Sequence, residues 1–216
     1  MSIFISLLLV ILLTFSYKIV DLTFRMLIGR ALYQKIEHAM IYIWGTLITI
    51  IAFFYVDNFV FRLPIHYEPI IPLILITAIT FMFTSRHSGY HPIGKKNILN
   101  FVIMYPIFEE VIFRGMMIPI LNNSLPTYSV LELFHTPVTL PILLSAFLFA
   151  IAHLQYYSLN RTSVKFMLFA FLGGILLGMI ANDSLSIVFA LFLHIEFNLL
   201  AVYYSKKFSK KGKSIS

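Results

Sequence analysis

The 216-residue sequence has no cysteine and few charged residues, and both absences narrow its function. Without cysteine the chain cannot form disulfides, thiol nucleophiles, or Cys-ligated zinc and iron–sulfur sites. Charged residues make up 12 % of the chain and hydrophobic residues 60 %, whereas soluble domains carry roughly 25 % charged residues. With so little polar surface, much of the exterior must face lipid. The composition therefore predicts an integral membrane protein.

Apolar segments recur along the whole chain and predict an all-α, polytopic transmembrane helical bundle of about seven spans. They are continuous rather than alternating, so a lipid-facing barrel is disfavoured and we expect no strands. Several are shorter than the roughly 20 residues that cross a bilayer, so flanking residues or local thinning must complete the crossing. The predicted spans are 3–17, 40–56, 70–84, 98–121, 138–154, 166–181 and 185–204.

Three charged residues, Lys18, Asp21 and Arg25, follow the first span at spacings that share one helical face. We interpret them as a solvated, ion-paired stripe at the membrane surface. In the sixth predicted span, Gly174 and Gly178 form a small-xxx-small pair, which is typical of close helix packing.

The placement of lysine and arginine predicts the orientation, because cytoplasmic loops retain positive charge. With the amino terminus outside, only Arg62 lies in an outer loop. The inner loops and the tail then hold Arg30, Lys35, Arg86, Lys95, Lys96, Arg161, Lys165, Lys206, Lys207, Lys210, Lys211 and Lys213. Topology thus accounts for the net charge of +7, and we expect no nucleic-acid partner. The basic tail is expected to lie on anionic lipid headgroups.

The fourth predicted span carries Glu109, Glu110 and Arg114 near its middle. Unpaired, three such charges oppose insertion by on the order of 8–10 kcal/mol, so something must compensate for them. Glu110 and Arg114 are four residues apart in the favourable order for a pair on one face. Glu109 points about 100° away around the helix and can face another group.

Two later spans also carry polar groups in apolar surroundings. Phe149 and His153 are one turn apart in the fifth, and His194 and Asn198 are one turn apart in the seventh. Each histidine alone is more often a packing residue, but three spans with such groups predict a shared polar cavity. Glu196 projects to nearly the opposite side from His194 and has no assigned role.

Another pair, His87 and His91, has the spacing of helical metal ligands. Gly89 and Pro92 argue against a helix there, so we interpret both as solvated loop histidines.

Three motifs occur in order on hydrophobic segments: EEVIFR at 109–114 fits EExxxR, FAIAH at 149–153 fits FxxxH, and HIEFN at 194–198 fits HxxxN. With them the chain resembles the CAAX-protease and bacteriocin-processing (CPBP or Abi) family of intramembrane proteases. The resemblance makes residues 98–204 a protease-like core. Residues 1–97 form three spans without a recognised motif, and residues 205–216 form a basic cytoplasmic tail.

The resemblance implies roles for these residues. Glu109 and His153 would activate a water molecule, and His194 and Asn198 would stabilise the oxyanion or position the peptide. The supporting residues would be Glu110, Arg114 and Phe149. The sequence requires no cofactor. The zinc motif HExxH is absent, although a divalent metal such as zinc is compatible with the family, so metal dependence stays open.

We therefore expect a glutamate- and histidine-dependent intramembrane endopeptidase that acts on hydrophobic or membrane-anchored peptides. CAAX-like processing, peptide maturation and bacteriocin self-immunity all fit this class. The alternatives are a non-catalytic immunity or scaffold protein with the same fold, and a small proton-relaying transporter. We expect a bacterial plasma membrane location, with the amino terminus outside, the carboxyl terminus cytoplasmic and the site reached from the cytoplasmic leaflet. The oligomeric state is open.

Overall fold

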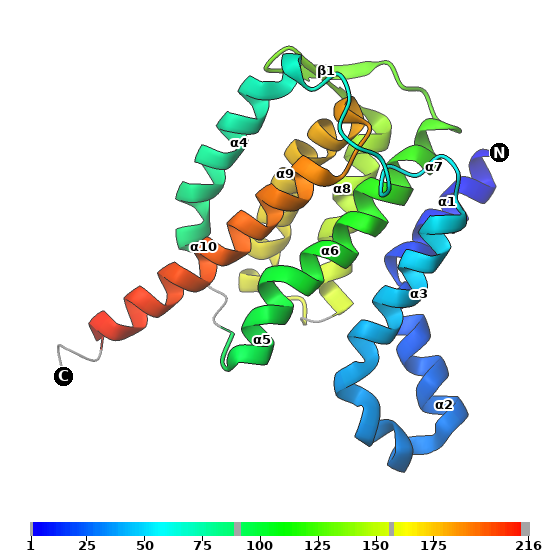
Figure 1. Ribbon diagram of the computed structural model, residues 1–216, viewed down its shortest axis with the longest axis vertical. Helices are drawn as coiled ribbons and strands as arrows, with labels where there is room; N and C mark the ends of the chain where they lie inside the picture. The colour runs from blue at the N-terminus through cyan, green and yellow to red at the C-terminus, as the bar shows by residue number, and fades with distance from the viewer. Residues whose placement is uncertain (1, 89–91, 156–157, 213–216) are drawn as a thin grey trace.

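The computed structural model describes residues 2–88, 92–155 and 158–212, which form a helical bundle with one small β-hairpin (Figure 1). The elements of the first half are α1 Ile3–Thr14, α2 Ser16–Ile36, η1 Glu37–Ala39, α3 Met40–Phe54, η2 Glu68–Ile70, α4 Ile71–Thr84 and η3 Ser85–His87. Those of the second half are α5 Lys95–Leu99, η4 Asn100–Met104, α6 Tyr105–Glu110, η5 Val111–Met117, α7 Ile118–Asn122, β1 Ser129–Leu133, β2 Thr136–Thr139, α8 Leu140–Ala152, η6 His153–Gln155, α9 Arg161–Ser184 and α10 Val188–Gly212.

The predicted helical membrane bundle is confirmed. Among the described residues, four stretches are helical, long and apolar enough to cross a membrane, namely Ser16–Phe54, Glu68–His87, Ser163–Ser184 and Val188–Lys207. Shorter apolar helices cover Ile3–Thr14 and Leu140–Gln155. The number of about seven spans stays a prediction.

The chain from α5 to α7 forms one continuous helical rod, in which η4 and η5 have the wider π-helical register. Every residue from 110 to 121 is buried, so this rod lies in the centre of the bundle. A loop from the first half packs against it, where the Phe59 N–H donates to the Gly115 carbonyl at 2.8 Å. In an α-helix that carbonyl would face the nitrogen of Pro119, which has no hydrogen to donate. The central position of the rod explains how an apolar segment tolerates charged residues.

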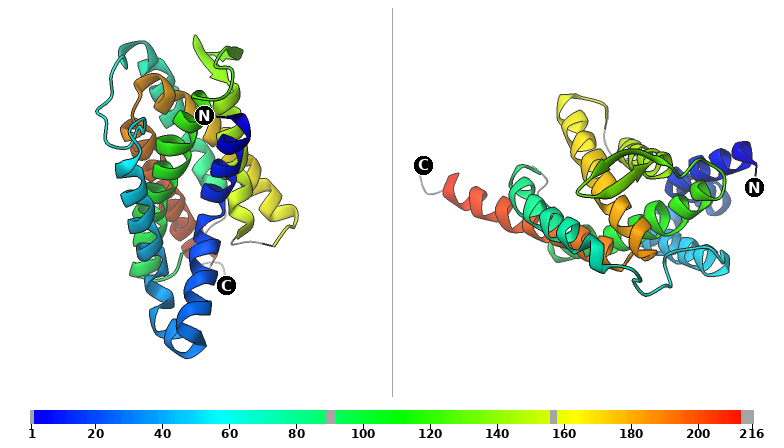
Figure 2. Two further views of the ribbon diagram at one scale, coloured as in Figure 1. Left: turned by 90° about the vertical axis from the view of Figure 1, so that its right-hand side faces the viewer. Right: turned by 90° about the horizontal axis from the view of Figure 1, so that it is seen from above.

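The amino-terminal helices form a hairpin that projects beyond the rest of the bundle at one end, as Figures 1 and 2 both show. The turn occurs inside α2 at Gly29, whose φ of 72° suits glycine. Asp21 is buried, accepts a hydrogen bond from the Tyr33 hydroxyl and lies 3.5 Å from Arg25. Our interpretation of a solvated stripe is therefore wrong for Asp21, because the returning chain covers it.

The β-hairpin contradicts the expectation of no strands. β1 pairs with β2 in antiparallel fashion, and Phe134 and His135 make the turn with positive φ, as two-residue hairpin turns require. Between two membrane helices the chain leaves the apolar bundle here, and strand pairing satisfies its backbone groups. The predicted span at 138–154 consequently begins as strand, and its helix starts only at Leu140.

Other boundaries also differ from the prediction. α10 begins at Val188 rather than at 185, because Leu185 has a φ of 51° and interrupts the helix. Its other end reaches Gly212, so most of the predicted tail continues the helix, and Lys213 lies outside the described residues. His87 lies in the short helix η3 rather than in an open loop, and His91 lies outside the described residues.

The close packing predicted for Gly174 and Gly178 is present. A Cβ on Gly174 would lie 3.1 Å from the Ala146 side chain, and one on Gly178 would lie 3.0 Å from Ile142. Helices α8 and α9 therefore approach each other closely next to the site described below.

Candidate active site

The two candidate glutamates end α6, a short α-helical piece between π-helical segments. Pro106 accounts for the first of these segments, because it lacks an N–H and its ring clashes with the preceding turn. In the wider register the Tyr105 N–H donates to the Asn100 carbonyl. Such π-helical segments occur frequently at functional sites.

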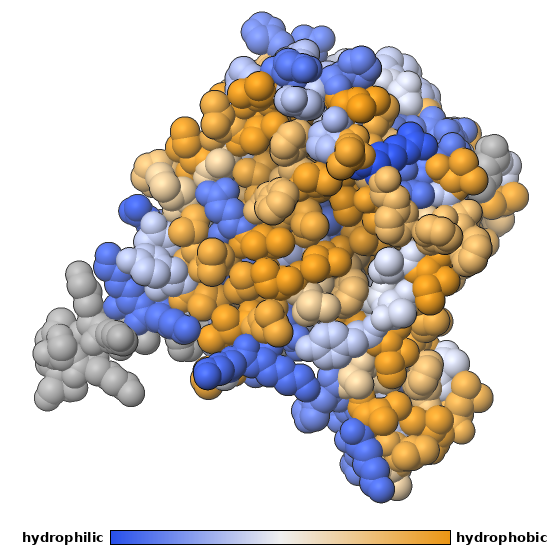
Figure 3. Space-filling model, in the orientation of Figure 1, coloured by the Kyte–Doolittle hydropathy of each residue, from blue (hydrophilic) through white to orange (hydrophobic). Residues whose placement is uncertain are grey.

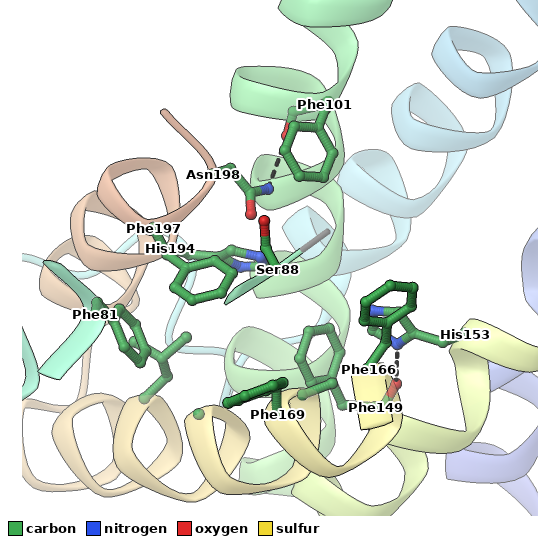
Figure 4. Close-up of a pocket in the computed structure, with 13 residues that line it drawn as sticks. Phe81, Ser88, Phe101, Phe149, His153, Phe166, Phe169, His194, Phe197 and Asn198 are labelled. Carbon is green, nitrogen blue, oxygen red and sulfur yellow. Dashed lines mark hydrogen bonds between the residues drawn. The ribbon is translucent and has the colours of Figure 1, made fainter. Parts of the chain in front are cut away.

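Asn198 of α10 completes this distorted turn. In the π-helical register the carbonyl of Phe101 would meet the nitrogen of Pro106, which carries no hydrogen. The Asn198 side-chain amide donates to this carbonyl instead, at 2.8 Å (Figure 4). One N–H of this amide thus joins α10 to the rod just before the glutamates. The other N–H of the same nitrogen can donate to a different acceptor.

Glu110, Arg114 and His194 form a buried cluster. Arg114 Nη1 donates to Glu110 Oε1 at 2.8 Å, and the exposed fractions of the two side chains are 1 % and 0 %. His194 Nδ1 also lies 2.8 Å from Glu110 Oε1. The carboxylate therefore contacts both the guanidinium and the imidazole, the second contact being one that the sequence did not predict.

Glu109 lies on the other side of the same imidazole. Its Oε2 atom is 3.7 Å from His194 Nε2, which is beyond a direct hydrogen bond. With Nδ1 next to Glu110, the other ring nitrogen, Nε2, is the one that faces Glu109. The Glu109 side chain keeps an exposed fraction of 20 %, unlike Glu110 at 0 %. The two adjacent glutamates thus occupy different environments.

Phe149 connects this cluster to the second histidine. The Arg114 guanidinium lies 4.4 Å from the centre of its ring, and the His153 and His194 rings contact its edges with centroids 5.1 Å and 5.9 Å away. His153 Nδ1 lies 2.9 Å from the Phe149 carbonyl. The backbone thereby fixes one nitrogen of His153 and leaves Nε2 for the cavity.

A cavity of about 130 Å³ lies between α8, α9 and α10 (Figure 4). Four of the predicted site residues line it, namely Phe149, His153, His194 and Asn198, whereas Glu109, Glu110 and Arg114 are not among the described residues that line it. Most other lining residues are apolar, and they include Phe81, Phe101, Phe166, Phe169, Phe197 and Leu177. Glu196 is not among the described residues that line it.

The described residues do not fit a metal ion held by three protein ligands. Within residues 2–88, 92–155 and 158–212, no group of three His, Asp or Glu side chains is arranged to hold a metal. Zinc in catalytic sites takes three protein ligands, and Glu109 with His194 supplies only two. No step below is routed through a metal.

Several features of the site were missed from the sequence. The contact between His194 and Glu110 joins residues 84 positions apart, and the Asn198 contact uses a backbone carbonyl. Pro106 was a usable signal, since its position predicts a distorted turn just before the glutamates. The cavity-lining phenylalanines of α4 and α9 carry no motif.

Fold and cluster together define a polytopic helical membrane protein with a carboxylate–imidazole–guanidinium site beside an apolar cavity. A family model described as type II CAAX prenyl endopeptidase Rce1-like matches residues 96–200, which include all seven predicted site residues. This part of the chain belongs to the Rce1-like family, within the CPBP group. Comparisons with curated proteins and with solved structures gave no match.

Proposed function

We propose that the protein is an intramembrane endopeptidase that hydrolyses a peptide bond in a hydrophobic or membrane-anchored peptide. The observation that carries this proposal is the placement of His194 between two glutamates at the wall of a cavity that His153 and Asn198 also line. Amide hydrolysis requires a base for the attacking water and donors for the oxyanion, and these side chains supply both.

In the proposed reaction, Glu109 accepts a proton from a water molecule that His153 Nε2 helps to orient. The water oxygen bonds to the carbonyl carbon, and the carbonyl oxygen takes up the negative charge. The second amide N–H of Asn198 is the proposed donor to that oxyanion, and His194, which Glu110 holds in place, is proposed to position the peptide. Glu109 then returns the proton to the leaving nitrogen, the C–N bond breaks, and a carboxylic acid and an amine result, which exchange the remaining proton to give a carboxylate and an ammonium group.

Glu110 and Arg114 act in this proposal as positioning residues. Arg114 binds Glu110, and the Glu110 carboxyl group in turn fixes the orientation of the His194 ring. Phe149 packs against the Arg114 guanidinium and the rings of His153 and His194, which limits the movement of all three.

The apolar cavity supports a substrate class. Its phenylalanines suit an apolar peptide side chain or a lipid-modified residue close to the cut bond. We propose processing of a CAAX-like terminus, maturation of a membrane-bound peptide precursor, or cleavage of a bacteriocin in self-immunity. For location we propose the bacterial plasma membrane, with the lysine-rich end of the bundle on the cytoplasmic side.

Cleavage of fluorogenic prenylated and unmodified hydrophobic peptides by the purified protein tests the proposal. We expect Glu109→Gln to lower the cleavage rate by about 10²–10⁴-fold, because it removes the base. Glu196→Gln is the matched control, since this carboxylate is also on a membrane helix but away from the cavity. It should cleave like the wild type.

Two results would count against the peptidase. Glu109→Gln could retain full activity while folding normally, or the wild type could bind the peptides at the cavity without cutting them. The second result would favour the non-catalytic immunity or scaffold protein.

A further inference from the structure

A second, larger cavity lies away from the candidate active site, between the turn joining α2 to α3 and the beginning of α5. Its volume is about 510 Å³. It shares no lining residue with the first cavity among the described residues, and its wall consists of Tyr17, Glu37, His38, Ile41, Ile93, Gly94, Lys95, Lys96, Asn97, Asn100 and Tyr105. We call it the α2–α5 cleft.

The α2–α5 cleft is basic at its mouth. Lys95, Lys96 and His38 line it together with one carboxylate, that of Glu37. Glu37 also lines an adjoining hollow with Arg25 and Arg30, so further positive charge continues along the hairpin. Deeper in the cleft the polar groups are neutral, with the hydroxyls of Tyr17 and Tyr105 and the amide of Asn100. This gradient suits an anionic group held at the mouth.

The cleft also lies at the depth of lipid headgroups. Lys95 precedes Glu109 by fourteen residues in the central rod, which corresponds to about 21 Å at 1.5 Å per residue. Half of a bilayer's hydrocarbon core is about 15 Å thick, so a glutamate near mid-membrane places Lys95 among the headgroups. Figure 3 shows hydrophilic residues along the lower edge of an apolar face, where α5 begins and the hairpin turns.

Apolar side chains stand exposed on the elements that form the cleft. Ile93 is 76 % exposed and Leu99 is 52 % exposed, and on the hairpin Met26 and Leu27 are 77 % and 78 % exposed. The acyl chains of a lipid bound by its headgroup in the cleft would lie against such side chains, a contact that a soluble anion does not make.

We propose that the α2–α5 cleft binds the phosphate ester headgroup of an anionic phospholipid, with Lys95 and Lys96 on the phosphate and the acyl chains along the neighbouring apolar side chains. The lysines would interact with the phosphate as positive charges, and the tyrosine and asparagine groups would accept and donate hydrogen bonds to a hydroxylated headgroup. This site does not depend on peptidase activity.

The test is native mass spectrometry of the detergent-purified protein titrated with phosphatidylglycerol. We expect Lys95→Gln/Lys96→Gln to bind the first phosphatidylglycerol roughly 25-fold more weakly, equivalent to about 2 kcal/mol for two lysines near the charged surface. The matched control, Arg161→Gln/Lys165→Gln, removes the same charge from exposed positions at the start of α9 and should leave that affinity unchanged. Lys95→Arg/Lys96→Arg should bind like the wild type.

Two further compounds in the same titration identify the class of ligand. Phosphatidylcholine should bind weakly, and soluble glycerol phosphate should not displace phosphatidylglycerol. Equal losses in the two double-glutamine variants would overturn the proposal, because the effect would then be general electrostatics. Displacement by glycerol phosphate at similar concentration would also overturn it, since the ligand would be a soluble phosphate ester.

Discussion

The chain contains two acid–base pairs with the same four-residue spacing, one in each half. Asp21 and Arg25 lie 3.5 Å apart in α2, outside the family match, and the Arg25 side chain is 52 % exposed. Glu110 and Arg114 lie 2.8 Å apart inside the matched region, and both are almost fully buried. In the first pair the aspartate also binds Tyr33, and in the second the glutamate also binds His194.

The difference shows that surroundings rather than spacing decide what such a pair does. In α2 the Asp21 carboxylate binds both Arg25 and Tyr33 and so joins the two parts of α2 on either side of its turn. Water can still reach the arginine. In the central rod the Glu110 carboxylate orients the imidazole of His194 in the candidate active site. No solvent is present there to replace a partner that a substitution removes. Equivalent substitutions in the two halves should therefore have unequal effects.

The largest difference is expected when the arginines are replaced. Arg114→Leu leaves the Glu110 carboxylate buried without its cation, which typically costs about 3–5 kcal/mol. Arg25→Leu should have little effect, because its side chain is half exposed. Thermal unfolding and the yield of monodisperse protein in detergent measure both variants. Similar losses in the two variants would show that burial is not the deciding factor.

A smaller difference is expected between two glycines. A Cβ on Gly45 of α3 would clash with the ring of Phe108, the residue before Glu109, whereas a Cβ on Gly173 of α9 would lie 3.5 Å from Phe81. Gly45→Ala should therefore cost about 1–3 kcal/mol through overpacking and slow peptide cleavage. Gly173→Ala should leave the unfolding temperature unchanged or raise it.

A second substitution sharpens this test. Phe108→Leu in the Gly45→Ala background makes room for the added methyl group and should recover part of the lost stability. If it does not, contact with the Phe108 ring is not the cause.

The smallest effect is expected from a hydrogen bond that joins the halves. The Tyr42 hydroxyl of α3 donates to Asn100 Oδ1 of η4 at 2.6 Å, so Tyr42→Phe should cost about 1 kcal/mol. The control is Tyr203→Phe, since Tyr203 is 55 % exposed on α10. Chemical denaturation in mixed micelles can resolve the two. An unfolding midpoint for Tyr42→Phe that equals the Tyr203→Phe value would show that this hydrogen bond does not stabilise the protein.

Lipid solvation explains how well the helices were predicted from sequence. A run such as 70–84 must form a helix in a bilayer because its backbone has no other hydrogen-bond partners, and α4 covers Ile71–Thr84. Outside the apolar runs that constraint disappears. The hairpin at 129–139 and the turn at Gly29 therefore depended on local chemistry that the span prediction ignored.

The candidate site was predicted as a set of residues but not as a set of contacts. Helical spacing correctly predicts that Glu110 pairs with Arg114, because both residues lie on one helix. It cannot indicate that Glu110 also binds His194, or that Asn198 binds a carbonyl beside Pro106, since these contacts depend on how α10 packs on the rod. Which residues carry the chemistry stays a prediction.

The packing around Trp44 gives the protein a built-in optical probe. Trp44 is the single tryptophan of the chain, and its buried indole donates to Ser16 Oγ at 2.9 Å and contacts the Tyr17 and Phe108 rings. All indole emission therefore originates at the seam between the first helices and the turn that carries Glu109. Fluorescence during unfolding would register the separation of these two parts, whereas circular dichroism would register the loss of helix, and a mismatch between the two curves would reveal the seam opening first.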